Sequence, residues 1–466
     1  MIDRELLKKA LAVALEKGGD FADIFAEQSE YNWVIADDKK LKTDRSAESG
    51  LGIRVVRNHN TFYAITDSFS EDKILTLAAY VRDAAGGNSN RDIKLDLREE
   101  SNQWPFAFMI PPRDADIARK VACVKEAEDQ AWTAPNIKQV TTRFADQQRQ
   151  IMLATTLDDK VINHTLGLTE FSVMVIIDRN GQRENGRFGR SFYGGMENLT
   201  GEFAPDNFAR EAVRKAELAL TARDCPRGTM PVVFAPGVNG ILFHESCGHG
   251  MEADLIEKGS VFGGKIGQAV ASEIVTLVDD GTLPGYGGSF EFDDEGTPSQ
   301  KTVLIENGIL RGYMHSAVTA QKMGVAPTGS GRRQSYKYPP IPRMRNTYIL
   351  GGETDPQDII KDTKRGLYAV DTGGGGQVNV ITGEFITGIK IGYVIEDGKL
   401  AYPVKGAAII GRGIDTLGAI DMIGNDLEIT KMSGRCGKGS QQVPVGVGMP
   451  TVRVKSLNVG GTGEAI

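Results

Sequence analysis

Apolar and polar positions repeat along this chain with two different periods, which predict helices in some segments and strands in others. In the first half, apolar residues recur every three to four positions, as in amphipathic helices, in four segments. These segments are 1–20, 70–81, 114–132 and 205–219. Alternation with a period of two, together with turn residues between the runs, predicts strands in three further segments. These are 21–30, 51–66 and 138–193.

The order of strands followed by a helix therefore occurs twice in the first half. We interpret this as a structural duplication, although no sequence identity is visible between the two copies. A polar, proline-containing stretch over 88–112 is interpreted as the connection between the units. Turn-forming residues from Asp224 to Gly228 predict a domain boundary. We therefore expect an N-terminal α+β region over 1–225 and a second domain over 226–466.

The second half has the pattern of a loop-rich, antiparallel β domain. A short apolar strand is predicted over 231–235, and an apolar helical segment follows it. Hairpins are expected at Asn307-Gly308 and Asp397-Gly398, because type I′ turns need these residue types. Many of the 56 glycines lie in this half, which favours turns and strands over a helical bundle. The predicted class of the whole chain is α+β.

Composition excludes several classes of protein. Of the 466 residues, 40% are hydrophobic and 25% are charged, which is ordinary for a soluble protein. The net charge of −7 makes nucleic acid an unlikely ligand, because nucleic-acid binders usually carry a basic face. No apolar run is long enough for a membrane span, and residues 1–20 lack the apolar core of a signal peptide. Four widely spaced cysteines give no disulfide framework. We expect a cytoplasmic protein without a membrane partner.

The strongest chemical signal is a Glu between two histidines that lie five positions apart. His244 and His249 are two of only five histidines, and Glu245 lies between them in an apolar helical segment. Two imidazoles and a carboxylate can supply zinc ligands and a general base. In a regular helix, side chains five residues apart point about 140° away from each other. The spacing therefore predicts a distorted helix, such as a π-turn, near Cys247 and Gly248.

A catalytic zinc ion normally has three protein ligands, so a third ligand is needed. The sequence leaves five candidates open: Glu252, Asp254, His315, Cys247 and Cys436. On local geometry alone Glu252 is favoured, because it lies three residues beyond His249 on roughly the same helix face. The alternative interpretation is that both histidines are ordinary core or surface residues and that Glu245 is a solvated carboxylate.

A cluster of basic and aromatic residues forms a second candidate site. Capture of a peptide carboxylate or acidic side chains is one interpretation, for which we select Arg332, Arg333 and Tyr336. A solvated or dimer-contact loop is the alternative, and nucleic-acid binding is a third. The glycines over 373–376 lack the context of a phosphate-binding loop and predict a turn. The full cluster is Arg332, Arg333, Tyr336, Lys337, Tyr338, Arg343 and Arg345.

The segment from His244 to Asp254 resembles the HExxxH motif of the TldD branch of the TldD/PmbA family, and the resemblance extends over nearly the whole chain. It implies a cytoplasmic zinc metallopeptidase that hydrolyses unfolded or small peptides inside a dimer chamber. By this resemblance His244, His249 and Cys436 are the zinc ligands, and Glu245 activates the zinc-bound water. Glu252 then either contacts one of the zinc ligands without binding zinc itself, or is an alternative ligand. The other matching segments are 293–298, 329–336, 342–344, 424–428, 436–438 and 444–448.

The resemblance also indicates which partners to expect. The PmbA branch lacks the HExxxH pattern, so His244, Glu245 and His249 assign this chain to the catalytic branch. We expect either a homodimer or a heterodimer with a PmbA-like partner. Cys247 departs from the small apolar residues of many relatives, and we interpret it as a buried, inert thiol. The alternative function is a non-catalytic binding or regulatory protein that acts on a DNA-processing partner such as gyrase.

Peptide recognition by adding a strand to an exposed sheet edge is a hypothesis suited to a peptidase of broad sequence tolerance.

Overall fold

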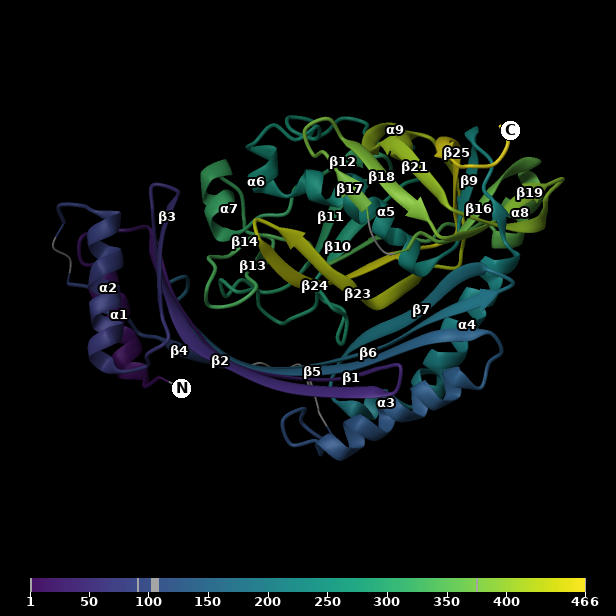
Figure 1. Ribbon diagram of the computed structural model, residues 1–466. Coiled ribbons are helices and arrows are strands. Elements are labelled where there is room, and N and C mark those ends of the chain that lie inside the picture. Colours follow the sequence, from purple (N-terminus) through teal and green to yellow (C-terminus); the bar gives the residue numbers. More distant parts are fainter. Residues whose placement is uncertain (1, 90–91, 102–108, 374–375, 466) are drawn as a thin grey trace.

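The structure is a computed structural model that describes residues 2–89, 92–101, 109–373 and 376–465, apart from the side chains of 101, 432 and 433. A long curved sheet from the first half of the chain runs beneath a compact body formed by the second half (Figure 1). Helices flank the sheet at both of its ends, and the second half lies on its concave side. This arrangement is α+β, as the sequence predicts.

The curved sheet has seven strands in the order β3-β2-β1-β5-β6-β4, with β7 paired to β6. All neighbours are antiparallel except β4, which pairs with β6 in parallel. Two short 3₁₀ helices, η1 (Met196–Asn198) and η2 (Gly201–Phe203), follow β7. The other elements are α1 (Arg4–Leu15), β1 (Phe21–Asp37), β2 (Lys40–Arg57), β3 (Asn60–Thr66), α2 (Glu71–Ala85), β4 (Arg98–Ser101), α3 (Ile117–Trp132), β5 (Ile137–Thr155), β6 (Lys160–Arg179), β7 (Gln182–Tyr193) and α4 (Pro205–Thr221).

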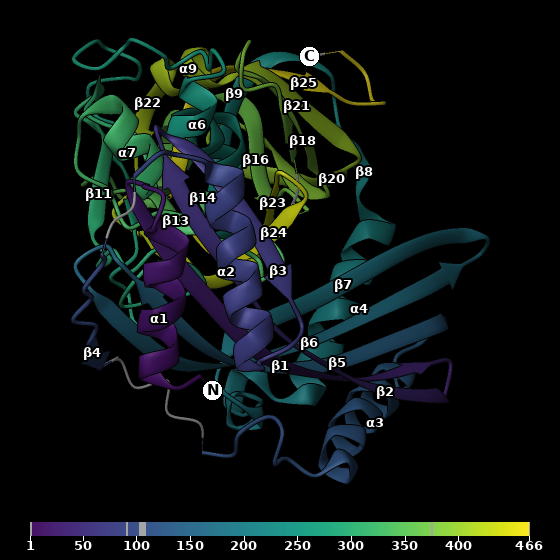
Figure 2. The ribbon, with the colours of Figure 1, turned by 90° about the vertical axis from the view of Figure 1, so that its left-hand side faces the viewer.

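Two separate cores hold the helices on this sheet. The helices α1 and α2 lie side by side (Figure 2) and pack on one end of the sheet through Leu11, Ile53 and Ile74. The helices α3 and α4 pack together on the other end, where Phe144 and Phe208 are fully buried. A helix, three antiparallel strands and a second helix therefore occur twice in succession. The expected boundary after residue 225 stays a prediction.

The second half forms a ten-stranded and a six-stranded sheet around one apolar core. The order of the larger is β17-β18-β21-β25-β9-β16-β19-β20-β8, with β22 paired to β25, and that of the smaller is β12-β11-β10-β15-β24-β23. The elements are β8 (Arg223–Asp224), β9 (Gly228–Phe234), η3 (Gly237–Gly240), α5 (Ile241–Phe243), η4 (His244–Gly248), η5 (His249–Met251), α6 (Ala253–Ile256), β10 (Leu277–Asp280), β11 (Lys301–Glu306), β12 (Ile309–Leu310), α7 (Ala317–Met323), β13 (Gly331–Arg332), β14 (Ile341–Pro342), β15 (Asn346–Ile349), α8 (Pro356–Asp362), β16 (Arg365–Asp371), β17 (Gly376–Val378), β18 (Glu384–Ile389), β19 (Ile391–Glu396), β20 (Lys399–Lys405), β21 (Ala407–Arg412), α9 (Gly413–Gly418), β22 (Ile420–Ile423), β23 (Glu428–Lys438), β24 (Gln441–Met449) and β25 (Val452–Gly460).

Buried charges join the curved sheet to the second half. Arg54 of β2 pairs with Asp23 of β1 and, at 2.8 Å, with Glu295 of a loop in the second half. Arg333, also from the second half, donates to the other oxygen of Asp23 at 3.1 Å. All four side chains are fully buried in this network. The two halves are therefore fixed together by paired charges that water does not reach.

Most of the predicted helices and turns are confirmed. Pro205 is the first residue of α4, and Asp116 caps α3 through its side chain. The hairpin turns at Asn307 and Asp397 have the positive φ angles that type I′ geometry requires. None of the described helices is long and apolar enough to cross a membrane.

Two segments differ from the prediction. Residues 31–50 were not expected to be strand, yet β1 and β2 run through them as a continuous ladder. Their side chains are largely polar, and those of 40–49 are exposed, so the alternation that marks a half-buried strand is missing. The expected connection over 88–112 contains the strand β4, while 90–91 and 102–108 lie outside the described residues.

Candidate metal centre

The segment that carries the two histidines follows directly from a buried strand. The chain leaves β9, turns at Gly237 with a φ of +80°, and passes through η3 and α5 into η4. Leu242 and Phe243 are buried in the core of the second half and anchor the segment. The side chain of Asn239 donates to the carbonyls of Ala235 and Ala369, which ties the turn to the sheet. The backbone that presents His244 is therefore held on a rigid support.

The turn from His244 to Gly248 is a π-helix, which confirms the predicted distortion. The backbone N–H of His249 donates to the carbonyl of His244, five residues earlier. The wider turn brings both imidazoles to one side, with ring centroids 5.2 Å apart and the rings nearly perpendicular. Gly248 has no side chain at the point of closest packing, where a Cβ would lie 2.2 Å from Sδ of Met344. Any larger residue would push the turn away from its support.

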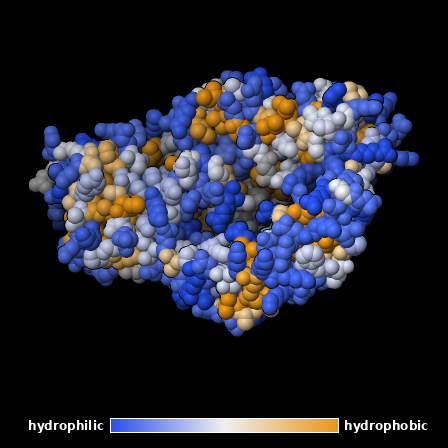
Figure 3. Space-filling model, in the orientation of Figure 1, coloured by the Kyte–Doolittle hydropathy of each residue, from blue (hydrophilic) through white to orange (hydrophobic). Residues whose placement is uncertain are grey.

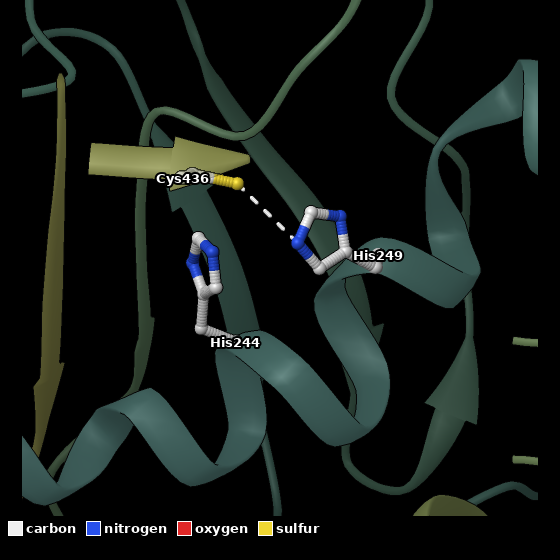
Figure 4. Close-up of side chains that lie close together, drawn as sticks. All are labelled: His244, His249 and Cys436. Carbon is white, nitrogen blue, oxygen red and sulfur yellow. Dashed lines mark hydrogen bonds between the residues drawn. The ribbon is translucent and has the colours of Figure 1, made fainter. Parts of the chain in front are cut away.

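Cys436 of β23 completes the group, although it lies 187 residues after His249. Its Sγ lies 3.3 Å from Nε2 of His249, and one ligand atom from each of the three residues lies within 4.8 Å of the others. Figure 4 shows both rings rising from the helical segment toward the sulfur of the strand. All three side chains are buried. Among the described residues, this is the one group of three or more His, Cys, Asp or Glu side chains placed to hold a metal ion.

The surroundings of these atoms fit a bound metal ion. Neither ring nitrogen of the buried His244 has a hydrogen-bond partner in the described part of the chain. A buried polar atom without a partner costs free energy unless a ligand satisfies it. Burial raises the pKa of Cys436, but the neighbouring imidazoles of His244 and His249 outweigh burial and lower this pKa well below its ordinary value. Two imidazoles and a thiolate are a typical donor set for a transition metal.

Glu245 lies beside the three residues and remains partly accessible. Its Oε2 is 3.9 Å from Nε2 of His249, and 22% of its side chain is exposed. Burial raises the pKa of Glu245 above its ordinary value, and the two histidines offset part of that increase. A carboxylate of raised pKa beside an open space can accept and release a proton.

Glu252 supports His249 from the opposite side of the ring. Its Oε2 lies 2.8 Å from Nδ1 of His249, while Nε2 of the same ring faces Cys436. Burial raises the pKa of Glu252, but Lys438 and His249 outweigh it and lower the pKa to about 2. Local geometry alone favoured Glu252 as the third ligand. The structure instead places its carboxylate against the nitrogen that points away from the sulfur.

The remaining candidates for a ligand lie elsewhere. Asp254 forms an ion pair with Lys438 at 2.8 Å, and His315 is buried beside Thr328. Cys247 is fully buried against Ser246, and burial raises its pKa to about 12. This agrees with the expected inert thiol.

The basic cluster differs from the solvated loop that was one interpretation. Arg332 and Arg333 are each 2% exposed, and Tyr336 is 5% exposed. Arg332 donates to the carbonyls of Met344 and Pro444. Its neighbours Arg343 and Arg345 are buried in the same way, so a solvated loop is wrong for all four arginines. Of the predicted glycine turn over 373–376, residues 374 and 375 lie outside the described residues.

Sequence reasoning did not place two residues, Arg343 of the basic cluster and Lys438, beside the ligand candidates. Arg343 donates to the carbonyl of Cys436, and its Nε lies 4.0 Å from Glu252. Lys438 lies 3.2 Å from Glu252. Both residues lie in segments that resemble the TldD/PmbA family. This resemblance was the one feature of the sequence that could have indicated their place in the site. Their positive charges hold Glu252 in its ionised form beside His249.

Comparison with known proteins shows one family over most of the chain. Family models described as PmbA/TldA metallopeptidase domain 1, central domain and C-terminal domain match residues 22–85, 110–220 and 227–461. A metalloprotease TldD homolog of Haemophilus influenzae is 36% identical and covers 95% of this chain and 93% of its own length. The homolog of the same name from Buchnera aphidicola is 34% identical with the same coverage.

A solved structure has the same fold. It is a protein of Bacteroides thetaiotaomicron, described as a candidate modulator of DNA gyrase, with a TM-score of 0.76. The likeness covers 99% of this chain and all of the other, at 19% identity. At that identity the comparison shows the shared fold alone.

Proposed function

Because this chain belongs to the PmbA/TldD metallopeptidase family, we propose that it is a zinc-dependent peptidase with its active site at His244, Glu245, His249 and Cys436. The observation that carries the proposal is the approach of three ligand atoms to within 4.8 Å of one another across η4 and β23. Two imidazoles and one thiolate would hold the ion and leave one position open. When bound, zinc would supply Lewis acidity, which makes water more acidic and polarises a peptide carbonyl.

Glu245 is the proposed general base. Its carboxylate lies beside the ligand candidates without being one of them, and it is the member of the group that solvent reaches. It would accept a proton from the attacking water at its carboxylate oxygen and deliver that proton to the leaving amine. The increase of its pKa on burial favours both transfers, because a general base works best with a pKa near the operating pH.

His249 needs a fixed tautomer for this role, and Glu252 supplies it. An ionised carboxylate only accepts hydrogen bonds, so Nδ1 of His249 donates to Glu252, and Nε2 would bind the metal ion in place of its proton. Lys438 and Arg343 hold Glu252 in place. Glu252 is therefore a positioning residue in this proposal.

An extended peptide is the proposed substrate, bound along an edge strand. The strand β17 lies against η4, and a Cβ at Gly376 would lie 3.4 Å from Cγ of Glu245. Among the described strands, β17 pairs with β18 alone, so no described strand pairs with its other edge. Pairing through main-chain hydrogen bonds does not depend on the side chains of the peptide, which suits unfolded or small peptides of varied sequence.

Dimer formation around a chamber, with a second copy or a PmbA-like partner, is part of the proposal, as is a cytoplasmic location. Residues 40–49 of β2 are exposed and pair with β1 alone in the described structure. An open strand edge of this length is usually covered by another element or chain. This supports an assembly without identifying the partner.

The alternative of a non-catalytic regulator that acts on gyrase is less well supported. A binding protein has no need for a partly accessible Glu245 beside two buried imidazoles and a thiol. The net charge of −7 also disfavours direct contact with DNA.

Cleavage of a disordered peptide by the zinc-loaded protein tests the proposal. We expect Glu245→Gln to lose cleavage by about a hundred-fold or more while it retains zinc, since a general base contributes about 10²–10⁴-fold. Glu353→Gln replaces an exposed glutamate and serves as the control. Unchanged cleavage by Glu245→Gln would remove this residue from the mechanism.

A further inference from the structure

A cavity that is separate from the metal ligands lies between the curved sheet and the second half of the chain. Its volume is about 130 Å³, and its walls come from β1, β2, β5 and β6 on one side and from β13, β23, β24 and two loops on the other. The space-filling view shows the molecule hollowed between these parts, with a mostly hydrophilic rim (Figure 3). By this measure a void needs at least about 10–15 Å³ to hold a single water. The cavity therefore has room for a small organic acid or one end of a peptide.

The lining of this cavity includes four arginines and three carboxylates, Glu27, Glu48 and Asp294. Three of the four have a carboxylate partner: Arg149 pairs with Glu27 at 2.7 Å, Arg333 with Asp23 at 3.1 Å, and Arg435 with Glu170 at 3.3 Å. The fourth is Arg332, which is 2% exposed. Its guanidinium donates to two backbone carbonyls, and within the described part of the chain it forms no ion pair. The cavity wall therefore contains a buried positive charge without a counter-ion in contact.

The charge on Arg332 is unfavourable in the protein alone. Burial and Arg345 lower the pKa of Arg332 to about 10, and Tyr193 and Asp294 offset only part of this effect. A guanidinium in this state gains more from a bound anion than one that already has a carboxylate partner.

His164 provides a second unused polar group on the same wall. Its Nε2 is buried and has no hydrogen-bond partner among the described residues. Burial lowers the pKa of His164 to about 4, so the imidazole is neutral at pH 7 and can donate one hydrogen bond. The rings of His164 and Phe290 are stacked, and the guanidinium of Arg332 lies 5.4 Å from the centroid of Phe290. Phe290 thus holds both groups against the cavity.

We propose that this cavity binds a carboxylate group, with Arg332 as its counter-ion and His164 as a second hydrogen-bond donor. A carboxylate has one negative charge and two acceptor oxygens, which match one unpaired guanidinium and one free ring nitrogen. It can come from a free organic acid or from the C-terminus of a peptide. The β23–β24 hairpin contributes Arg435 to the cavity and the adjacent Cys436 to the metal centre, so one hairpin serves both sites.

Binding to the full chain, measured by calorimetry, tests the proposal without using peptidase activity. The probes are acetate, a short peptide with a free C-terminus and the same peptide as its C-terminal amide. We expect a free carboxylate to bind at least ten-fold more tightly than the amide. Binding of the peptide acid but not acetate identifies a peptide C-terminus as the ligand, whereas binding of acetate as well identifies a general carboxylate site. Equal binding of acid and amide, or no binding at millimolar concentration, overturns the proposal.

Substitutions of Arg332 and His164 test whether the carboxylate binds in this cavity. We expect Arg332→Gln and His164→Phe each to weaken carboxylate binding about ten-fold or more, the usual effect of removing a hydrogen bond that involves a charge. His164→Phe keeps an aromatic ring against Phe290, so it remains informative if Arg332→Gln does not fold. Arg143→Gln removes an exposed arginine of β5 that does not line the cavity, and it serves as the control. Carboxylate binding that persists in His164→Phe and in folded Arg332→Gln lies elsewhere, at the metal centre for example, and overturns the proposal.

Discussion

Nδ1 of His249 and Oε2 of Glu252 lie 2.8 Å apart, in the interior of the molecule. This contact decides which nitrogen of His249 is free for a ligand. Since Glu252 is ionised, Nδ1 is the donor to it, and Nε2, which is 3.3 Å from the sulfur of Cys436, is the nitrogen that would bind a metal ion in place of its proton. A carboxylate behind the ring is a common way to orient a metal-ligating histidine.

The first prediction concerns this support. We expect Glu252→Gln to weaken zinc binding by about ten- to a hundred-fold, the usual effect of losing such a partner. Competition with a chromophoric chelator measures the affinity. Asp254→Asn removes a carboxylate that pairs with Lys438 without contacting the ring, and it is the control. Equal zinc affinity in the wild type and Glu252→Gln would show that the contact does not position His249.

The second prediction concerns the π-turn. We expect Gly248→Ala to lower the free energy of unfolding by about 1–3 kcal/mol, because the added Cβ meets Met344 in a packed core. We also expect weaker zinc binding, because the displaced turn carries both histidines. Gly418→Ala places its Cβ in open space and controls for the change of residue type. Urea denaturation of both variants measures the difference, and similar stabilities would contradict the packing argument.

The third prediction concerns the buried charges that join the two halves. Arg54→Ala leaves the carboxylates of Asp23 and Glu295 buried without this partner. We expect it to lower the free energy of unfolding by about 3–5 kcal/mol. Arg45→Ala, on the same strand, breaks an exposed pair with Glu30 and should cost less than about 1 kcal/mol. If both variants lost the same stability in denaturant, the inter-half network would have no special role.

The fourth prediction concerns pH. The folded-state pKa of His164 is about 4, below the ordinary value of 6.5, because the ring is buried. As pH falls through 6.5 the unfolded chain takes up this proton first, so acid favours unfolding, and the stability is lost between pH 6.5 and pH 4. Between pH 7.5 and pH 5 we expect the wild type to lose about 2 kcal/mol more than His164→Phe. His59→Asn removes a histidine from an exposed turn and is the control. Parallel stability curves for the wild type and His164→Phe would contradict the prediction.

Elements with a strong local signal could be predicted from the sequence. The turns at Asn307 and Asp397 and the start of α4 at Pro205 each depend on residues that restrict their own backbone. The π-turn was predictable because five-residue spacing of His244 and His249 conflicts with a regular helix. The strands over 31–50 were not, because their side chains are largely polar and lack the apolar alternation that marks a half-buried strand.

The candidate site shows the same limit. Helical spacing placed Glu252 near His249 but could not tell a ligand from a support. The approach of Cys436 depends on β23 and β24 folding back over η4, so only the family resemblance indicated it. The burial of Arg332 and Arg333 could not be read from a run of basic residues, which resembles a solvated loop.

X-ray absorption at the zinc edge of the metal-loaded protein tests the central claim most directly. Two nitrogen ligands at about 2.0–2.1 Å and one sulfur ligand at about 2.3 Å are expected, with the sulfur signal lost in Cys436→Ala. A coordination shell without sulfur in the wild type, or one that Cys436→Ala leaves unchanged, would contradict the assignment of His244, His249 and Cys436 as the metal ligands.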